Sequence, residues 1–82
     1  MSTSATPTTK DLITGLLVDK FEVDPARVQP GTPMTELLVD SLMVVEMAIS
    51  LKDELGVAVT EEEIRDLAFA EFSDRVDRKR VL

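Results

Sequence analysis

Hydrophobic residues recur at intervals of three and four along most of the chain, which is the spacing of helices with one buried face. Near the start, this pattern is formed by Leu12, Ile13, Leu16, Leu17 and Phe21. Thr8 or Thr9 can cap the helix, and Asp11 is well placed in its first turn. We therefore predict a first amphipathic helix that begins near Thr8 or Thr9.

Residues 23–35, VDPARVQPGTPMT, break the pattern with three prolines and a glycine. Proline lacks the backbone N–H that a helix interior needs, so we predict a long connection here. Asp24 and Pro25 can start one short turn, and we expect Val28 and Met34 to pin the loop to the core. Long loops of this kind often border a functional site.

A second helix is predicted from about Ser41 to Leu55, with Gly56 as a left-handed stop. One face of it forms a continuous hydrophobic stripe of Val44, Met47, Ala48, Leu51 and Leu55. A second hydrophobic set, Leu42, Val45 and Ile49, lies on another face beside Glu46, Lys52 and Asp53. This second set is either an exposed strip edged with acids or the seat of a third helix, and periodicity leaves both open.

Two shorter helices complete the chain. Thr60 and Glu63 fit a capping box, which predicts a short third helix over about Glu61 to Leu67. A fourth helix is predicted from about Glu71 to Arg80, with Ser73 as a possible interruption or cap. The basic residues of its last turn suit the negative end of a helix. Because no stretch alternates with a period of two, the fold class is all-α.

Composition narrows the possible functions. The 82 residues allow one domain, predicted at 8–82 after a disordered tail at 1–7. Neither cysteine nor histidine is present, so we expect no disulfide, no metal site and no serine–histidine hydrolase. The net charge of -7 disfavours nucleic acid and anionic membranes and favours basic protein partners. Without a signal or spanning segment, we expect a cytoplasmic monomer.

Ser41, at the predicted start of the second helix, has two interpretations. A serine there is usually a cap, but Asp40 could cap equally well and leave the Ser41 hydroxyl free. A phosphate on that oxygen would meet the unpaired N–H groups at the positive end of the helix. Covalent modification is chemically reasonable, although the pattern of residues does not decide it.

The segment Asp40-Ser41-Leu42 opens a predicted helix that continues through VVEMAISL. A proline-containing loop precedes this helix, and Gly56 and the acidic turn 61–63 follow it. This arrangement resembles the acyl carrier protein family. The resemblance covers about Thr9 to Lys79. It implies a four-helix bundle with a long first loop and a short third helix. It also implies a 4'-phosphopantetheine arm, attached to Ser41 by a phosphopantetheinyl transferase that uses coenzyme A. Family members carry acyl or aminoacyl groups on this arm as thioesters.

By the same resemblance, the second helix is the surface that partner enzymes contact. The residues that match partner-facing positions are Leu42, Val45, Glu46, Ile49 and Asp53. The implied partners are an acyltransferase, ketosynthase or adenylating enzymes with basic docking patches. The expected function is that of a discrete, non-catalytic acyl carrier in polyketide or other secondary-metabolite biosynthesis. A stand-alone aminoacyl or peptidyl carrier and an unmodified helical adaptor are the alternatives.

Three positions depart from the family pattern, one of which is Glu71, where the family often has a threonine that opens the last helix. Leu38 stands where the family usually has glycine, so the turn before Ser41 is expected to differ in shape. Met43 stands where carriers of fatty-acid biosynthesis often have an acid. These departures favour a specialised pathway over housekeeping fatty-acid synthesis, and the leucine at position 38 also resembles some stand-alone aminoacyl carriers.

Overall fold

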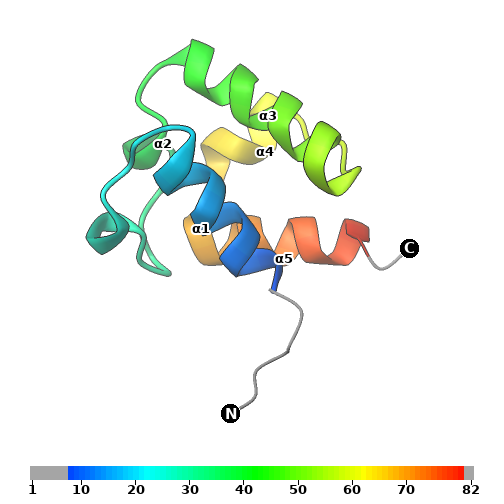
Figure 1. Ribbon diagram of the computed structural model, residues 1–82, viewed down its shortest axis with the longest axis horizontal. Helices are drawn as coiled ribbons and strands as arrows, with labels where there is room; N and C mark the ends of the chain where they lie inside the picture. Colours follow the sequence, from blue (N-terminus) through cyan, green and yellow to red (C-terminus); the bar gives the residue numbers. More distant parts are fainter. Residues whose placement is uncertain (1–7, 81–82) are drawn as a thin grey trace.

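The computed structural model describes residues 8–80, so the predicted tail at 1–7 lies outside the described residues. Helices account for most of the described part (Figure 1). In order they are α1 (Thr9–Asp19), the 3-10 turn η1 (Pro25–Arg27), α2 (Met34–Leu37), α3 (Ser41–Leu55), α4 (Glu61–Asp66) and α5 (Phe69–Arg80). Within residues 8–80 the only β-type pairing is an isolated bridge between Pro33 and Ala68. The all-α class is confirmed.

Helix α1 begins as predicted, because Thr8 and Asp11 form a reciprocal capping box. The Asp11 backbone N–H donates to Thr8 Oγ1 at 3.1 Å. Ile13 and Leu17 are fully buried, and α1 lies beside α5, which joins the first and last helices of the chain (Figure 1). The buried face of α1 therefore covers the side of the core next to α5.

The connection after α1 contains one predicted turn and one helix that was not predicted. Asp24 caps η1 by accepting from the Ala26 N–H at 3.0 Å. Met34 and Thr35, placed in the loop by the sequence pattern, belong instead to the single-turn helix α2. A helix this short has little stability of its own, but it buries both Met34 and Leu37. Burial against the core, rather than local propensity, explains α2.

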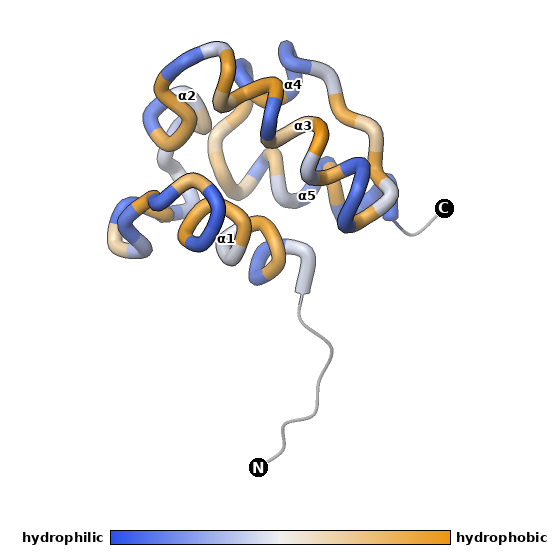
Figure 2. The backbone as a smooth tube through the Cα atoms, turned by 45° about the horizontal axis from the view of Figure 1, so that its top comes forward, coloured by the Kyte–Doolittle hydropathy of each residue, from blue (hydrophilic) through white to orange (hydrophobic). Residues whose placement is uncertain are grey.

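The core is formed by hydrophobic side chains from every α-helix, and hydrophobic and hydrophilic stretches alternate along the chain (Figure 2). In α3, the predicted stripe is buried at Val44, Met47 and Leu51, while Ala48 and Leu55 are only half-buried. Gly56 ends α3 with a φ of 69°, and its N–H donates to the carbonyls of Leu51 and Lys52. The predicted bounds of this helix and its glycine stop are therefore confirmed.

Helix α4 is fastened to α5 through the carboxylate of Glu63. Its Oε1 accepts from the Thr60 N–H and from Lys79 Nζ, both at 2.9 Å, and its Oε2 accepts from Arg75 Nη1 at 3.2 Å. The Thr60 N–H first, then Lys79 and Arg75, hold the pKa of Glu63 at about 2, below its ordinary 4.5. Ionised Glu63 thus links the α4 cap to the far end of α5.

The basic residues at the end of α5, predicted to suit the negative end of the helix, also make specific contacts. Lys79 Nζ donates to the Ala58 carbonyl at 2.8 Å as well as to Glu63. Arg80 Nη1 donates to Thr9 Oγ1 at 2.8 Å. These contacts tie the last turn of α5 both to α1 and to the segment that precedes α4.

Helix α5 starts at Phe69, two residues before the predicted start at Glu71. The N–H groups of Phe69 and Ala70, which would otherwise be unpaired at a helix start, donate to the carbonyls of Thr32 and Pro30. Ser73 neither interrupts nor caps the helix, but lies buried inside it. The early start depends on pairing with a distant loop, which local sequence does not encode. None of the helices in 8–80 has the length and hydrophobicity needed to cross a membrane.

Candidate functional site

Ser41 is the first residue of α3 and is exposed to solvent. The cap of the helix is the preceding residue, since Asp40 Oδ1 accepts from the Met43 N–H at 2.9 Å. Within residues 8–80, the Ser41 hydroxyl forms no side-chain hydrogen bond. The structure confirms that Asp40 can cap α3, so the Ser41 hydroxyl is not needed for the cap.

The start of α3 favours a negative charge. A helix of 15 residues carries a partial positive charge at its N-terminus, where the first N–H groups have no partner within the helix. Asp40 satisfies the N–H of Met43, which leaves those of Ser41 and Leu42 without a partner from the cap side chain. A phosphate attached to Ser41 would be stabilised there without a cationic side chain.

The turn before Ser41 has a shape that leucine adopts without strain. Leu38 has φ -116° and ψ 91°, which is extended backbone rather than the left-handed region that favours glycine. Its side chain is buried in the core, and its N–H donates to the Met34 carbonyl at 2.8 Å. Leu38 is thus a core residue that anchors the turn carrying Asp40 and Ser41.

The second hydrophobic set on α3 remains largely uncovered, which resolves the alternatives left open by periodicity. Helix α4 packs against α3, yet Leu42 and Ile49 remain 65% and 54% exposed. Val45 is half-buried, and Glu46 and Asp53 are exposed. The structure therefore keeps the five predicted partner-facing residues on α3, with four of them exposed to solvent.

Two surface features near this strip were not predicted. Val39, just before Asp40, is the most exposed large hydrophobic residue within 8–80, at 69%. One indication of this exposure was present in the sequence. Leu38 and Val39 are adjacent hydrophobic residues in a non-helical segment, where one of two neighbours is commonly buried and the other exposed. A shallow groove also adjoins the far end of the strip, lined by Ala48, Ile49, Lys52, Asp53, Ala58 and Val59.

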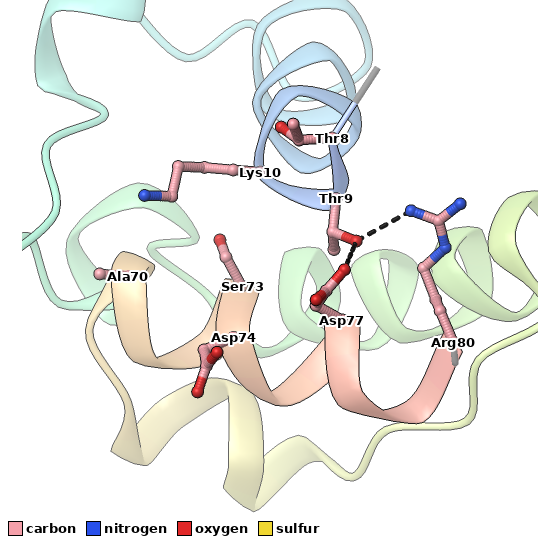
Figure 3. Close-up of a pocket in the computed structure, with 8 residues that line it drawn as sticks. All are labelled: Thr8, Thr9, Lys10, Ala70, Ser73, Asp74, Asp77 and Arg80. Atoms are coloured by element: carbon pink, nitrogen blue, oxygen red, sulfur yellow. Dashed lines mark hydrogen bonds between the residues drawn. The ribbon is translucent and has the colours of Figure 1, made fainter. Parts of the chain in front are cut away.

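A separate groove lies between the start of α1 and α5, and no residue of α3 lines it (Figure 3). Thr9 Oγ1 donates to Asp77 Oδ1 at 2.6 Å and accepts from Arg80, so these polar groups largely satisfy one another. Ser73 also lines this groove. Among residues 8–80 there is no cluster of three or more histidine, cysteine, aspartate or glutamate side chains suited to a metal ion.

A family model described as the phosphopantetheine attachment site matches residues 11–75. The chain belongs to this family. The match covers most of the sequence and includes α2, α3 and α4 in full. It agrees with the resemblance to acyl carrier proteins.

Members of the phosphopantetheine attachment family carry 4'-phosphopantetheine covalently on a serine. They interact with a phosphopantetheinyl transferase and with biosynthetic enzymes, and such carrier domains are generally non-catalytic. Three serines lie in the matched range of this family member, namely Ser41, Ser50 and Ser73. Ser50 and Ser73 are 1% and 3% exposed, whereas Ser41 is exposed.

Proposed function

We propose that this chain carries acyl groups on a 4'-phosphopantetheine arm attached to Ser41 and catalyses no reaction itself. The observation that carries the proposal is the contrast among the serines of the matched range. A transferase can reach the Ser41 hydroxyl without unfolding the protein, whereas Ser50 and Ser73 are closed off in the core. The arm supplies the thiol that this cysteine-free chain lacks.

The residues around Ser41 fit the attached group. Asp40 holds the helix start in place, so the hydroxyl projects from a defined turn. The N–H groups of Ser41 and Leu42, which the Asp40 side chain leaves unpaired, would donate to the phosphodiester oxygens. Leu42, the next residue, is exposed and would lie beside the arm where the transferase approaches.

The exposed strip on α3 supports a role as the docking surface for partner enzymes. Leu42, Val45 and Ile49 would provide a small apolar contact, and Glu46 and Asp53 would attract basic patches on the partner. Such a contact is small enough to release the carrier after each transfer. Acyltransferases, ketosynthases or adenylating enzymes are partners of the right kind.

Polyketide or related secondary-metabolite biosynthesis is the proposed setting. Met43 replaces an acid that carriers of fatty-acid biosynthesis often have on this helix, and Leu38 occupies a core position next to the turn that carries Ser41. Both departures support a specialised carrier. Loading assays on the modified protein, with acyl coenzyme A donors in one arm and aminoacyl adenylates in the other, distinguish an acyl carrier from an aminoacyl carrier.

Mass spectrometry tests the attachment directly. After incubation with coenzyme A and a broad-range phosphopantetheinyl transferase, we expect the protein to gain the mass of one phosphopantetheine arm. Ser41→Ala should abolish the gain, while Ser50→Ala, a matched change at a buried serine, should retain it. No gain in the wild-type protein, or a gain that survives Ser41→Ala, would refute the proposal.

A further inference from the structure

Val39 is exposed because its neighbours are fixed. Leu38 is buried, and both Leu38 and Asp40 have extended backbone angles. Val39 and Asp40, which follow Leu38, are both exposed, so the chain leaves the core directly after Leu38. The bond from the Met43 N–H to Asp40 holds the other side of this turn. Val39 is therefore a hydrophobic residue held on the surface by the core beneath it.

Val39 also lies next to the attachment point. Two residues of backbone span at most about 7 Å, which sets the largest separation between the Cα atoms of Val39 and Ser41. Leu42 follows Ser41 directly, so the serine has an exposed hydrophobic residue on each side, at 69% and 65% exposure. An enzyme that takes the Ser41 hydroxyl into its own active site must cover both of them.

The border of this apolar surface is acidic. No lysine or arginine occurs between Arg27 and Lys52, whereas Glu36, Asp40 and Glu46 are all exposed. Arg27 lies at one edge of this border, because its Nη2 donates to the Glu36 carbonyl at 2.9 Å, so the acidic character is clearest at Asp40 and Glu46. The matching partner surface is an apolar depression edged by arginine or lysine.

We infer that Val39 is a specificity-determining contact for the phosphopantetheinyl transferase, which binds Val39 and Leu42 together when it modifies Ser41. This inference rests on the proposed attachment at Ser41. In that step the Ser41 Oγ attacks the pantetheine-bearing phosphorus of coenzyme A. A new P–O bond forms, the pyrophosphate P–O bond breaks, adenosine 3',5'-bisphosphate leaves, and the hydroxyl proton passes to a base of the transferase.

The reaction geometry explains why Val39 matters at this step and not later. The transferase must bring Oγ itself to a phosphorus atom, so the protein surface within a few ångströms of Ser41 is covered. Enzymes that act afterwards reach a thiol at the far end of a flexible arm. They can dock on α3, at Leu42 and beyond, without covering the turn that carries Val39.

Val39→Thr tests this inference, because threonine keeps the β-branch and nearly the volume of valine while adding a hydroxyl to the apolar surface. With coenzyme A saturating and the carrier varied, we expect the KM of the transferase for the carrier to rise about three- to tenfold with little change in kcat. Val39→Ile, which keeps the surface apolar, should retain the wild-type KM. Thermal unfolding of all three proteins should coincide, because the residue is exposed.

The second readout uses protein that has been modified to completion. An acyltransferase that loads the wild-type carrier from acyl coenzyme A should load the Val39→Thr carrier with an unchanged kcat/KM. An unaltered transferase KM for Val39→Thr would overturn the inference, as would an equal loss in acyl loading, which would make Val39 part of a general docking surface. Failure of the proposed function is distinct, since wild-type protein would then gain no arm.

Discussion

Neutralising Glu63 should weaken the attachment of α4 to α5 in a way that depends on pH. In Glu63→Gln the side chain keeps its shape and an oxygen that can still accept from the Thr60 N–H. It loses the charge that binds Lys79 at 2.9 Å and Arg75 at 3.2 Å. The substitution therefore separates the ionic part of this contact from the helix cap.

The size of the effect follows from the pKa of Glu63. A fall of the pKa from 4.5 to about 2 favours folding with the ionised form by about 3 kcal/mol at neutral pH. Solvent screens part of this, since the side chains of Lys79 and Arg75 are 32% and 46% exposed, and glutamine retains the cap. We expect a loss of about 1–2 kcal/mol, against a total of about 4–12 kcal/mol for a domain of this size.

The sign of the pH dependence is set by the lowered pKa. The unfolded chain binds the Glu63 proton more readily than the folded chain, so the contribution of Glu63 is complete above pH 4.5. It is lost as the pH falls toward about 2. The difference in free energy of unfolding between wild type and Glu63→Gln should shrink over this range.

Urea unfolding followed by circular dichroism, at steps from pH 7 to pH 2.5, measures this difference. Glu61→Gln is the matched control, because Glu61 lies on the same helix and pairs with Arg65 at 3.2 Å with both side chains about half exposed. An exposed pair of this kind should contribute less than about 0.5 kcal/mol. The reasoning fails if the Glu63→Gln loss is independent of pH or no larger than that of Glu61→Gln.

Two further substitutions test buried positions, one next to the turn before Ser41 and one in α5. Leu38→Gly introduces the residue that the family usually has. It should lower the free energy of unfolding in urea by about 3–5 kcal/mol, because it removes a buried side chain. A variant as stable as the wild type would show that Leu38 is not part of the core. Ser73→Ala removes a buried hydroxyl that has no hydrogen-bond partner among residues 8–80, and should raise the stability by about 1 kcal/mol. A clear loss of stability in that variant would mean that the hydroxyl is paired.

Much of the fold could be predicted because its signals are local. The Thr8 and Thr60 capping boxes, the Asp24 turn and the Gly56 stop each depend on residues within one helical turn, and all occur in the structure. The two features that were not predicted depend on contacts between residues far apart in the sequence. Helix α2 forms because Met34 and Leu37 are buried, and α5 starts early because the loop carbonyls of Thr32 and Pro30 accept its first N–H groups.

The candidate site around Ser41 was likewise predicted in part. The chain of amino acids alone determined that Ser41 begins a helix, that Asp40 can cap it, and that one set of hydrophobic residues on that helix exceeds what a single buried stripe needs. Periodicity counts hydrophobic faces but does not say which face a neighbouring helix covers. Only the packing of α4 and the burial of Leu38 decided that Leu42, Ile49 and Val39 remain on the surface, because solvent exposure depends on contacts between residues that are far apart in the sequence.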